Sequence, residues 1–239
     1  MAMKNELYFG FDDEAKQVTE LIDRMGALTP MVLAIREVEK NGVESNERFF
    51  QAHGYSKKEV LFKRDWKYPQ KLSVINIDGD YLSPEVAKKH LGTIANSGNW
   101  SSVSKALGLA PNFGQGVKIS YITKAKCGIE YRSKSHDGEG IKFIIRKLDN
   151  GQYGFQNLWD EELEEWVSFG RCESFGPELS AATSGTEVVF LGDTEEEDTW
   201  NVFCTACSLS GRSSQSGQTI RDWLGSRNWE EVGSHTTRV

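Results

Sequence analysis

The second half of the chain alternates between apolar and polar residues with the two-residue period of β-strands. The turn dipeptides Asp137-Gly138 and Asn150-Gly151 separate these runs. Strands joined by tight turns pair in antiparallel fashion, so this half of the chain predicts an antiparallel meander. The predicted strands cover residues 129–132, 140–148, 153–159 and 165–169, and a further strand covers residues 184–191.

The first half of the chain contains the stronger helical signals. Apolar residues at helical spacing predict a helix over residues 30–45, with Thr29 as the candidate N-cap and Pro30 in its first turn. A basic stretch at residues 57–67 is interpreted as a solvated loop or a strand edge. The combination of helices and a meander indicates the α+β class. The other predicted elements are strands at 6–11 and 71–77 and helices at 14–25, 84–91 and 219–229.

Composition limits the classes of function. Hydrophobic residues make up 38% and charged residues 26% of the 239 residues, which is typical of a soluble globular protein. The net charge of −7 argues against electrostatic binding of nucleic acid by the domain as a whole, so direct nucleic-acid binding is not indicated. No apolar run reaches membrane-spanning length, and the N-terminus lacks an apolar signal core. We therefore expect a cytoplasmic protein with no membrane partner.

The four cysteines do not form a metal-binding pattern. Cys204 and Cys207 make a single C-x-x-C pair, whereas a structural zinc site needs two more ligands. Cys127 and Cys172 are far from that pair in the sequence. We expect free thiols, because disulfides are rare in the cytoplasm.

Polar residues on the 30–45 helix suggest chemistry. Glu37 and Asn41 are four residues apart and Glu44 is three further on, so all three project from one face. A carboxylate can accept a proton from water, and a carboxamide oxygen suits a hard ion such as Mg2+. The alternative is a surface helix with solvated charges.

An acidic turn, Asp78-Gly79-Asp80, follows the strand at 71–77, and Ser83-Pro84 then begins a helix. A carboxylate at such a turn can accept a hydrogen bond from an amino group, such as the exocyclic group of adenine. The alternative is a tight turn whose aspartates only cap backbone groups.

A segment rich in Gly, Ser and Asn covers residues 92–116 and leads into a predicted helix at 117–123. Long segments of this composition include functional lids. Glycines before a helix N-terminus let backbone N–H groups approach a phosphate, and Lys118 adds a positive charge in the first turn.

The order of these motifs resembles the GHKL ATPase domain of gyrase B, heat-shock chaperones, histidine kinases and MutL, and is closest to MORC- or MutL-like members. The segment 34–41 is similar to the family's N-box, and 113–120 is similar to its second glycine box. Gly185-Thr186 is similar to the last motif on the adenine side, and 220–229 is similar to the segment that leaves the domain.

The resemblance implies a Bergerat-type ATP-binding fold: a two-layer sandwich of a mixed, mostly antiparallel sheet with helices on one face. Residues 1–239 would form a single ATPase domain, the N-terminal part of a longer protein. The nucleotide lid would lie at about 92–116 and the exit segment at about 200–239.

The resemblance also implies roles for individual residues. Glu37 matches the catalytic base, and Asn41 matches the ligand of Mg2+. Asp78, with Gly79 beside it, is the first choice for the carboxylate that binds adenine, and Thr186 matches the residue near adenine. The remaining cofactor-binding positions, which match lid-hinge and phosphate contacts, are Asn112, Gly114, Gly116 and Lys118.

One motif departs from the family pattern D-x-G-x-G. If Ser83-Pro84 fixes the register, Ile77 takes the place of the aspartate and Tyr81 that of the second glycine. If Asp78 is the aspartate, the glycines are displaced. Asn76 and Asp80 stay open as alternatives to Asp78.

The resulting expectation is Mg2+-dependent ATP binding and slow hydrolysis, which would act as a conformational switch gated by the lid and by homodimerisation. A missing C-terminal region would bind the client. The alternative, given the altered motif, is a non-hydrolysing nucleotide sensor or a protein-interaction module.

Overall fold

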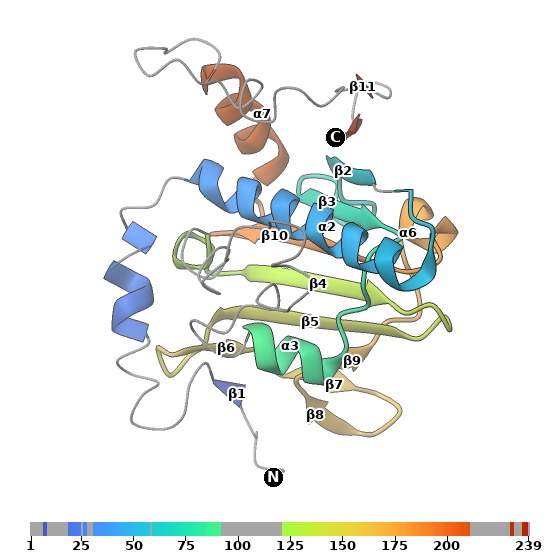
Figure 1. Cartoon of the computed structure of the whole chain (residues 1–239). Coiled ribbons are helices and arrows are strands. Elements are labelled where there is room, and N and C mark those ends of the chain that lie inside the picture. The colour runs from blue at the N-terminus through green and yellow to red at the C-terminus, as the bar shows by residue number, and fades with distance from the viewer. Residues whose placement is uncertain are drawn as a thin grey trace.

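The computed structural model describes residues 7–8, 19–24, 26–27, 31–57, 59–91, 121–210, 230–231 and 236–238. Within this part of the chain, helices lie against one large β-sheet (Figure 1). The sheet has ten strands in the order β1-β6-β5-β4-β10-β3-β2-β12-β11, and β9 pairs with β5 beside this path. Every pairing between the described strands is antiparallel. The α+β class with a mostly antiparallel sheet is therefore confirmed.

The strands of the sheet are β1 (Leu7–Tyr8), β2 (Glu59–Arg64), β3 (Leu72–Ile77), β4 (Gly128–Lys134), β5 (Gly140–Lys147), β6 (Tyr153–Phe155), β9 (Gly170–Arg171), β10 (Gly185–Gly192), β11 (Glu230–Glu231) and β12 (Thr236–Arg238). The labelled helices are α2 (Met31–His53), α3 (Pro84–Leu91), α6 (Pro177–Ala181) and α7 (Thr199–Ser210), with a 3-10 turn η1 at Ile122–Lys124. Residues 19–24 and 26–27 are also helical.

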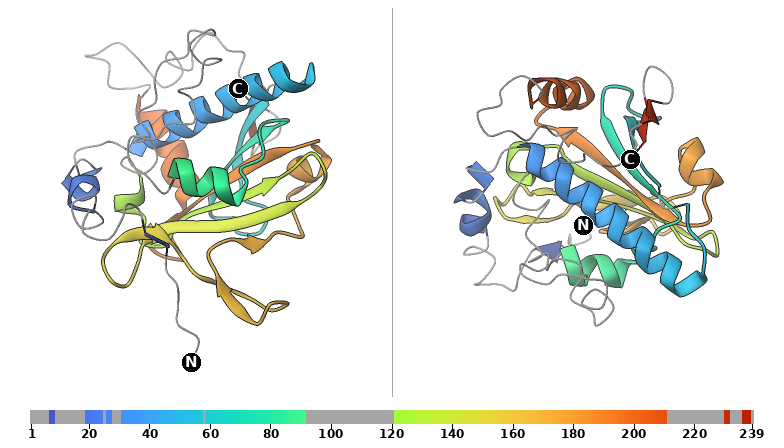
Figure 2. Two further views of the ribbon diagram at one scale, coloured as in Figure 1. Left: turned by 60° about the horizontal axis from the view of Figure 1, so that its bottom comes forward. Right: turned by 45° about the horizontal axis from the view of Figure 1, so that its top comes forward.

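Three helices share one face of the sheet. Val38 of α2, Ala87 of α3 and Phe203 of α7 belong to the same buried apolar cluster. The two views of Figure 2 show α2 crossing the sheet while α3 lies beside it on that face. The layered arrangement agrees with the two-layer sandwich, and the short α6 adds a small cover on the opposite face.

The meander is only partly as predicted. β4, β5 and β6 are successive neighbours, but the predicted strand 153–159 divides into β6 and β7 (Leu158–Asp160). β7 pairs with β8 (Glu165–Val167) in a separate two-stranded sheet, so the predicted strand 165–169 does not join the main sheet. β10 lies between β4 and β3, which places the late strand at the centre.

Two further features of the first half of the chain differ from the prediction. α2 continues to His53, because Asn46 and Phe49 extend its buried face beyond Ser45. The basic stretch is also not a solvated edge: residues 59–64 form β2, which is paired on both sides, and Phe62 is fully buried. The lysines and the arginine in and beside this strand obscure its apolar residues in the sequence pattern.

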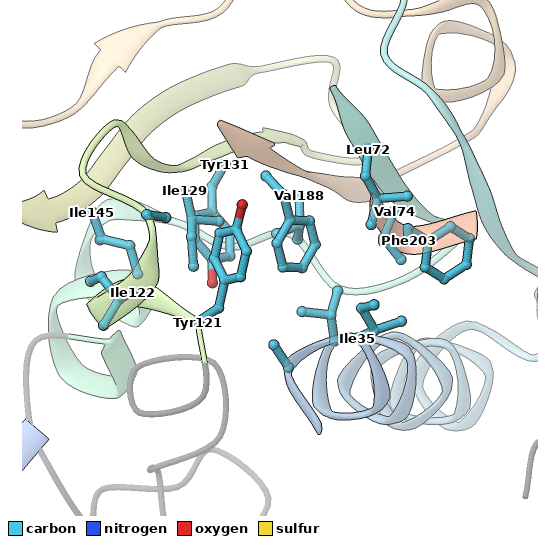
Figure 3. Close-up of a cluster of buried hydrophobic side chains, with 14 of the residues drawn as sticks. Ile35, Leu72, Val74, Tyr121, Ile122, Ile129, Tyr131, Ile145, Val188 and Phe203 are labelled. Carbon is cyan, nitrogen blue, oxygen red and sulfur yellow. The ribbon is translucent and has the colours of Figure 1, made fainter. Parts of the chain in front are cut away.

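The main core fills the space between the helices and the sheet (Figure 3). Ile35 of α2, Val74 of β3 and Val188 of β10 belong to it, and Phe62 stacks on Phe203 with ring centroids 5.4 Å apart. Burial of large side chains of this kind supplies about 1.5–3 kcal/mol each, so this layer fixes the position of α2 on the sheet.

The opposite face of the sheet holds a second, smaller core and a buried charge cluster. Leu179 of α6 packs on Ile75 and Ile77, whose side chains alternate with the helix-facing ones. In the charge cluster, the Arg132 guanidinium donates to Glu130 at 2.6 Å, to Asp65 at 2.7 Å and to Glu187 at 3.0 Å.

The charge cluster contains more buried negative than positive charge among its named members. Burial raises the pKa of the Glu187 carboxyl, and Asp65 adds to the rise, whereas Arg132 and the Ser73 hydroxyl oppose it. The Ser73 hydroxyl donates to the carboxyl at 2.7 Å. Glu187 therefore binds a proton more tightly in the folded state than in the unfolded state.

The raised pKa of Glu187 predicts a pH-dependent effect of Glu187→Gln. The contribution of Glu187 to stability is greatest below its unfolded pKa and is lost as pH rises through the folded pKa. The variant cannot ionise, so it should match the native protein near pH 4 and be the more stable of the two at pH 8. Urea unfolding across this range measures the difference, with exposed Glu161→Gln as the control. A difference between native protein and variant that is independent of pH would contradict the argument.

Candidate functional site

The turn at residues 78–83, between β3 and α3, is held by segments that are distant in the sequence. The backbone N–H of Asp78 donates to the Ser184 carbonyl at 3.0 Å, and the Ser184 hydroxyl donates to the Gly79 carbonyl at 2.6 Å. On the other side, the Arg48 guanidinium of α2 donates to the Asp80 carboxylate at 2.6 Å. The turn thus connects α2 to the start of β10.

Asp78 organises this turn from within. Its φ of 54° lies in the left-handed region, which aspartate tolerates better than most residues. One carboxylate oxygen accepts from the Thr183 backbone N–H at 2.9 Å, and the other accepts from the Lys57 backbone N–H at 3.2 Å. Only 3% of Asp78 is exposed, so both oxygens serve the protein's own backbone.

Asn76, two residues earlier, faces α2. Its side-chain Nδ2 donates to the Ser45 hydroxyl at 3.0 Å, and its Oδ1 accepts from the Thr186 backbone N–H at 2.6 Å. A weaker contact of 3.4 Å joins Nδ2 to Asn46 Oδ1. One carboxamide therefore joins α2, β3 and β10.

Strand register explains why these groups meet. Asn76, Thr186 and Ser133 are aligned across the adjacent strands β3, β10 and β4. Their side chains share the helix-facing side because Ile75 and Ile77 take the other side. The hydroxyls of Ser133 and Thr186 are 2.8 Å apart, and the former accepts from the Leu82 backbone N–H at 2.9 Å. We call Ser45, Asn76, Ser133 and Thr186 the polar junction.

Gly79 has no room for a side chain. A Cβ there would lie 1.9 Å from Asn76 Nδ2 and 2.8 Å from both Ser45 Oγ and Asn46 Oδ1. The glycine therefore lets the turn approach the polar junction closely.

Glu37, Asn41 and Glu44 follow one flank of α2 that leads away from the polar junction. Glu37 and Asn41 are half-buried, whereas Glu44 is only 2% exposed. With a rise of 1.5 Å per residue, Asn41 is about 6 Å and Glu37 about 12 Å from Ser45 along the helix axis. The flank presents oxygen donors at successive turns.

The electrostatics of this flank are shared between its members. Burial raises the pKa of Glu44; Lys40, at 3.8 Å, and Arg48 oppose the rise, and the charge of Glu37 adds to it. Burial is the largest of these influences and the charge of Glu37 the smallest. A cation near this flank would favour the ionised form of Glu44.

Part of the predicted site lies outside the described residues. This applies to Asn112, Gly114, Gly116 and Lys118, together with the segment 92–116 proposed as a lid. Within the described residues, no group of three or more His, Cys, Asp or Glu side chains can hold a metal ion. Mg2+ bound to phosphates needs only one or two protein ligands, so this observation does not bear on Asn41.

The described residues also bear on the predictions about cysteines and membrane-spanning segments. Cys127, Cys172 and Cys204 are free cysteines, and burial raises the pKa of each thiol. Cys207 lies in α7, but its side chain is outside what the structure describes. Among the described helices, none has the length and apolar character needed to cross a membrane.

Sequence reasoning misses Ser45, Asn46 and Ser133 as members of the site. Small polar residues such as Ser45 and Asn46 are typical of a helix end, although the helix continues and both are buried. Ser133 has no local signal, because its place opposite Thr186 follows only from strand register.

Comparisons with known proteins identify no family for this chain. No protein-family model matches it, and no curated protein matches it significantly. The geometry of the site is therefore the basis for any statement about function.

Gly79→Ala tests the close packing of the turn. The added Cβ would meet three polar atoms, so the variant should lose about 1–3 kcal/mol of unfolding free energy. Urea denaturation measures this loss. Gly170→Ala is the matched control, since a Cβ there has no neighbour closer than 3.4 Å. Equal stability of the two variants would contradict the packing described for Gly79.

Proposed function

We propose that this protein binds ATP with Mg2+ along the flank of α2 that carries Glu37 and Asn41, and hydrolyses it slowly as a conformational switch. The adenine base would lie beside the polar junction. This is the arrangement implied by the resemblance to GHKL ATPases, and several contacts of the described residues support it.

The observation that carries the proposal is the position of Asn76. Its carboxamide accepts from Thr186 of β10 and donates to Ser45 of α2, four residues beyond the segment that resembles the N-box. Asn76 itself lies where the sequence departs from the D-x-G-x-G pattern. One side chain thus brings together the two elements that carry the N-box-like and Gly-Thr motifs, and this favours a common ligand site.

The spacing along α2 fits an extended ligand. With its adenine beside Asn76, ATP would extend its phosphates along the helix towards Asn41 and then Glu37. These residues lie about one and two turns before Ser45 in α2. Asn41 would contribute an oxygen ligand to Mg2+. Mg2+ would neutralise charge on the phosphates. Glu37 would orient water and accept its proton, at a position where alignment supplies most of the rate.

The lid residues would complete the site. Asn112, Gly114, Gly116 and Lys118 would contact the phosphates, and closure of the 92–116 segment would gate both turnover and homodimerisation. Slow turnover is expected when a conformational step of this kind limits the rate.

The geometry favours Asn76 over Asp78 as the group that faces adenine. The Asp78 carboxylate accepts two backbone N–H groups at the turn, and the Asp80 carboxylate pairs with Arg48. Asn76 Oδ1 lies beside Thr186, the residue implied to be near adenine, and a carbonyl oxygen can accept a second hydrogen bond. We therefore assign Asp78 and Gly79 to shaping the turn.

A second candidate function rests on the same side chain. Both polar atoms of Asn76 already have protein partners, and Asn76 carries no charge. These facts favour a non-hydrolysing nucleotide sensor or a protein-interaction module. Binding of Mg-ATP without phosphate release would identify the sensor, and a folded protein that does not bind nucleotide would identify the interaction module.

Glu37→Gln separates binding from hydrolysis. The variant keeps the shape of the side chain but removes the proton acceptor, so phosphate release should fall by about 10²- to 10⁴-fold while Mg-ATP binding is retained. A coupled phosphate assay and calorimetry measure the two quantities. Glu47→Gln, about 15 Å further along α2, is the matched control and should hydrolyse normally. Native rates in Glu37→Gln would show that Glu37 is not the base.

A further inference from the structure

The β7–β8 hairpin stands apart from the main sheet and exposes two tryptophans. Trp159 is 51% exposed and Trp166 is 42% exposed, and Leu163 in the connecting turn is 61% exposed. The hairpin projects from the edge of the molecule in the left view of Figure 2. Large exposed aromatic residues are costly in water and are enriched where partners bind.

The two tryptophans form one surface. Trp159 and Trp166 are directly opposite each other in the strand register, and their rings meet edge to face with centroids 5.5 Å apart. Leu158 and Val167 point to the other side of the ribbon, where Leu158 lies near Gly170 of β9. The two tryptophans therefore lie on the side of the ribbon opposite the one that Leu158 turns towards β9.

The hairpin that carries this aromatic surface is strongly acidic. The hairpin has five acidic residues and no lysine, arginine or histidine, which gives it a formal charge of −5. They are Asp160, Glu161, Glu162, Glu164 and Glu165. Arg171, just beyond the hairpin, contacts Glu162 at 3.4 Å and thus offsets a single carboxylate of the five.

Hydrogen bonds within the connecting turn define the conformation of the hairpin. Asp160 Oδ1 accepts from the backbone N–H groups of Glu162 and Leu163, each at 3.1 Å, and Glu164 adopts a φ of 51°. This turn fixes the register that places the two indoles side by side. The backbone positions of the acidic and aromatic residues are therefore fixed relative to one another.

We propose that the aromatic side of the β7–β8 hairpin binds a lysine- and arginine-rich peptide segment of a partner protein. Indole faces attract cations, and the net negative charge of the hairpin favours a positively charged chain. A second copy of the hairpin, nucleic acid and an anionic membrane are all disfavoured, because each would bring more negative charge to this surface. The proposal is independent of nucleotide binding.

The test uses a labelled synthetic peptide rich in lysine and arginine, with a glutamate-rich peptide of equal length as the control ligand. Fluorescence anisotropy should show saturable binding of the basic peptide alone, and the affinity should fall as salt is added. In a proton–nitrogen correlation spectrum, the indole N–H signals of Trp159 and Trp166 should shift on binding. Binding without these shifts, or no binding, would overturn the proposal.

Two sets of variants show whether the hairpin itself binds. Glu161→Gln with Glu165→Gln should weaken binding, whereas Glu195→Gln with Glu196→Gln, an equal change of charge in another exposed turn, should not. Trp159→Ser should weaken binding by at least about tenfold. Circular dichroism establishes that each variant is folded. Equal losses in the two double variants, or a hairpin-dependent homodimer in sedimentation, would overturn the proposal.

Discussion

The carboxamide of Asn76 is the interaction on which the arrangement of the candidate site depends. It donates to Ser45 of α2 and accepts from the backbone of Thr186 in β10, while its own backbone belongs to β3. A buried polar group left without a partner costs about 1–3 kcal/mol, so both hydrogen bonds hold the elements in one arrangement. Together with the apolar core, these bonds place α2 so that Glu37 and Asn41 follow its flank away from this point.

The two faces of the sheet bury different kinds of side chain. The helix-facing side holds the large apolar core and, at the end of β3, the polar junction. The opposite side holds a small apolar cluster under α6 and the carboxylates around Arg132. Because successive side chains of a strand point to opposite faces, Thr186 of β10 reaches one face and Glu187, the next residue, reaches the other. A buried ionic network therefore lies behind the candidate site.

The spacing of apolar residues in the sequence predicts the elements whose formation depends on neighbouring residues. The apolar spacing of Ala34, Ile35 and Val38 predicts the first half of α2, and the apolar run at 71–77 predicts β3. The position of Asn76 opposite Thr186 could not be predicted, because it depends on pairing between strands far apart in the sequence. The predicted end of α2 is wrong for a related reason. Ser45 and Asn46 are polar residues typical of a helix end, but here they hydrogen-bond to strands β2 and β3, which the sequence pattern cannot show. The alternation in 153–169 indicates strands but cannot show that β7 and β8 leave the main sheet.

The most direct test of the central claim is a calorimetric titration of the folded protein with Mg-ATP. The arrangement of α2 around the polar junction predicts saturable binding by the native chain and marked weakening in Asn41→Ala, which removes the proposed oxygen ligand of Mg2+ without touching the core. Omission of Mg2+ should weaken binding by the native protein to a similar extent. Absence of binding by the folded native protein, or unchanged affinity in Asn41→Ala, would contradict a nucleotide site on this flank of α2.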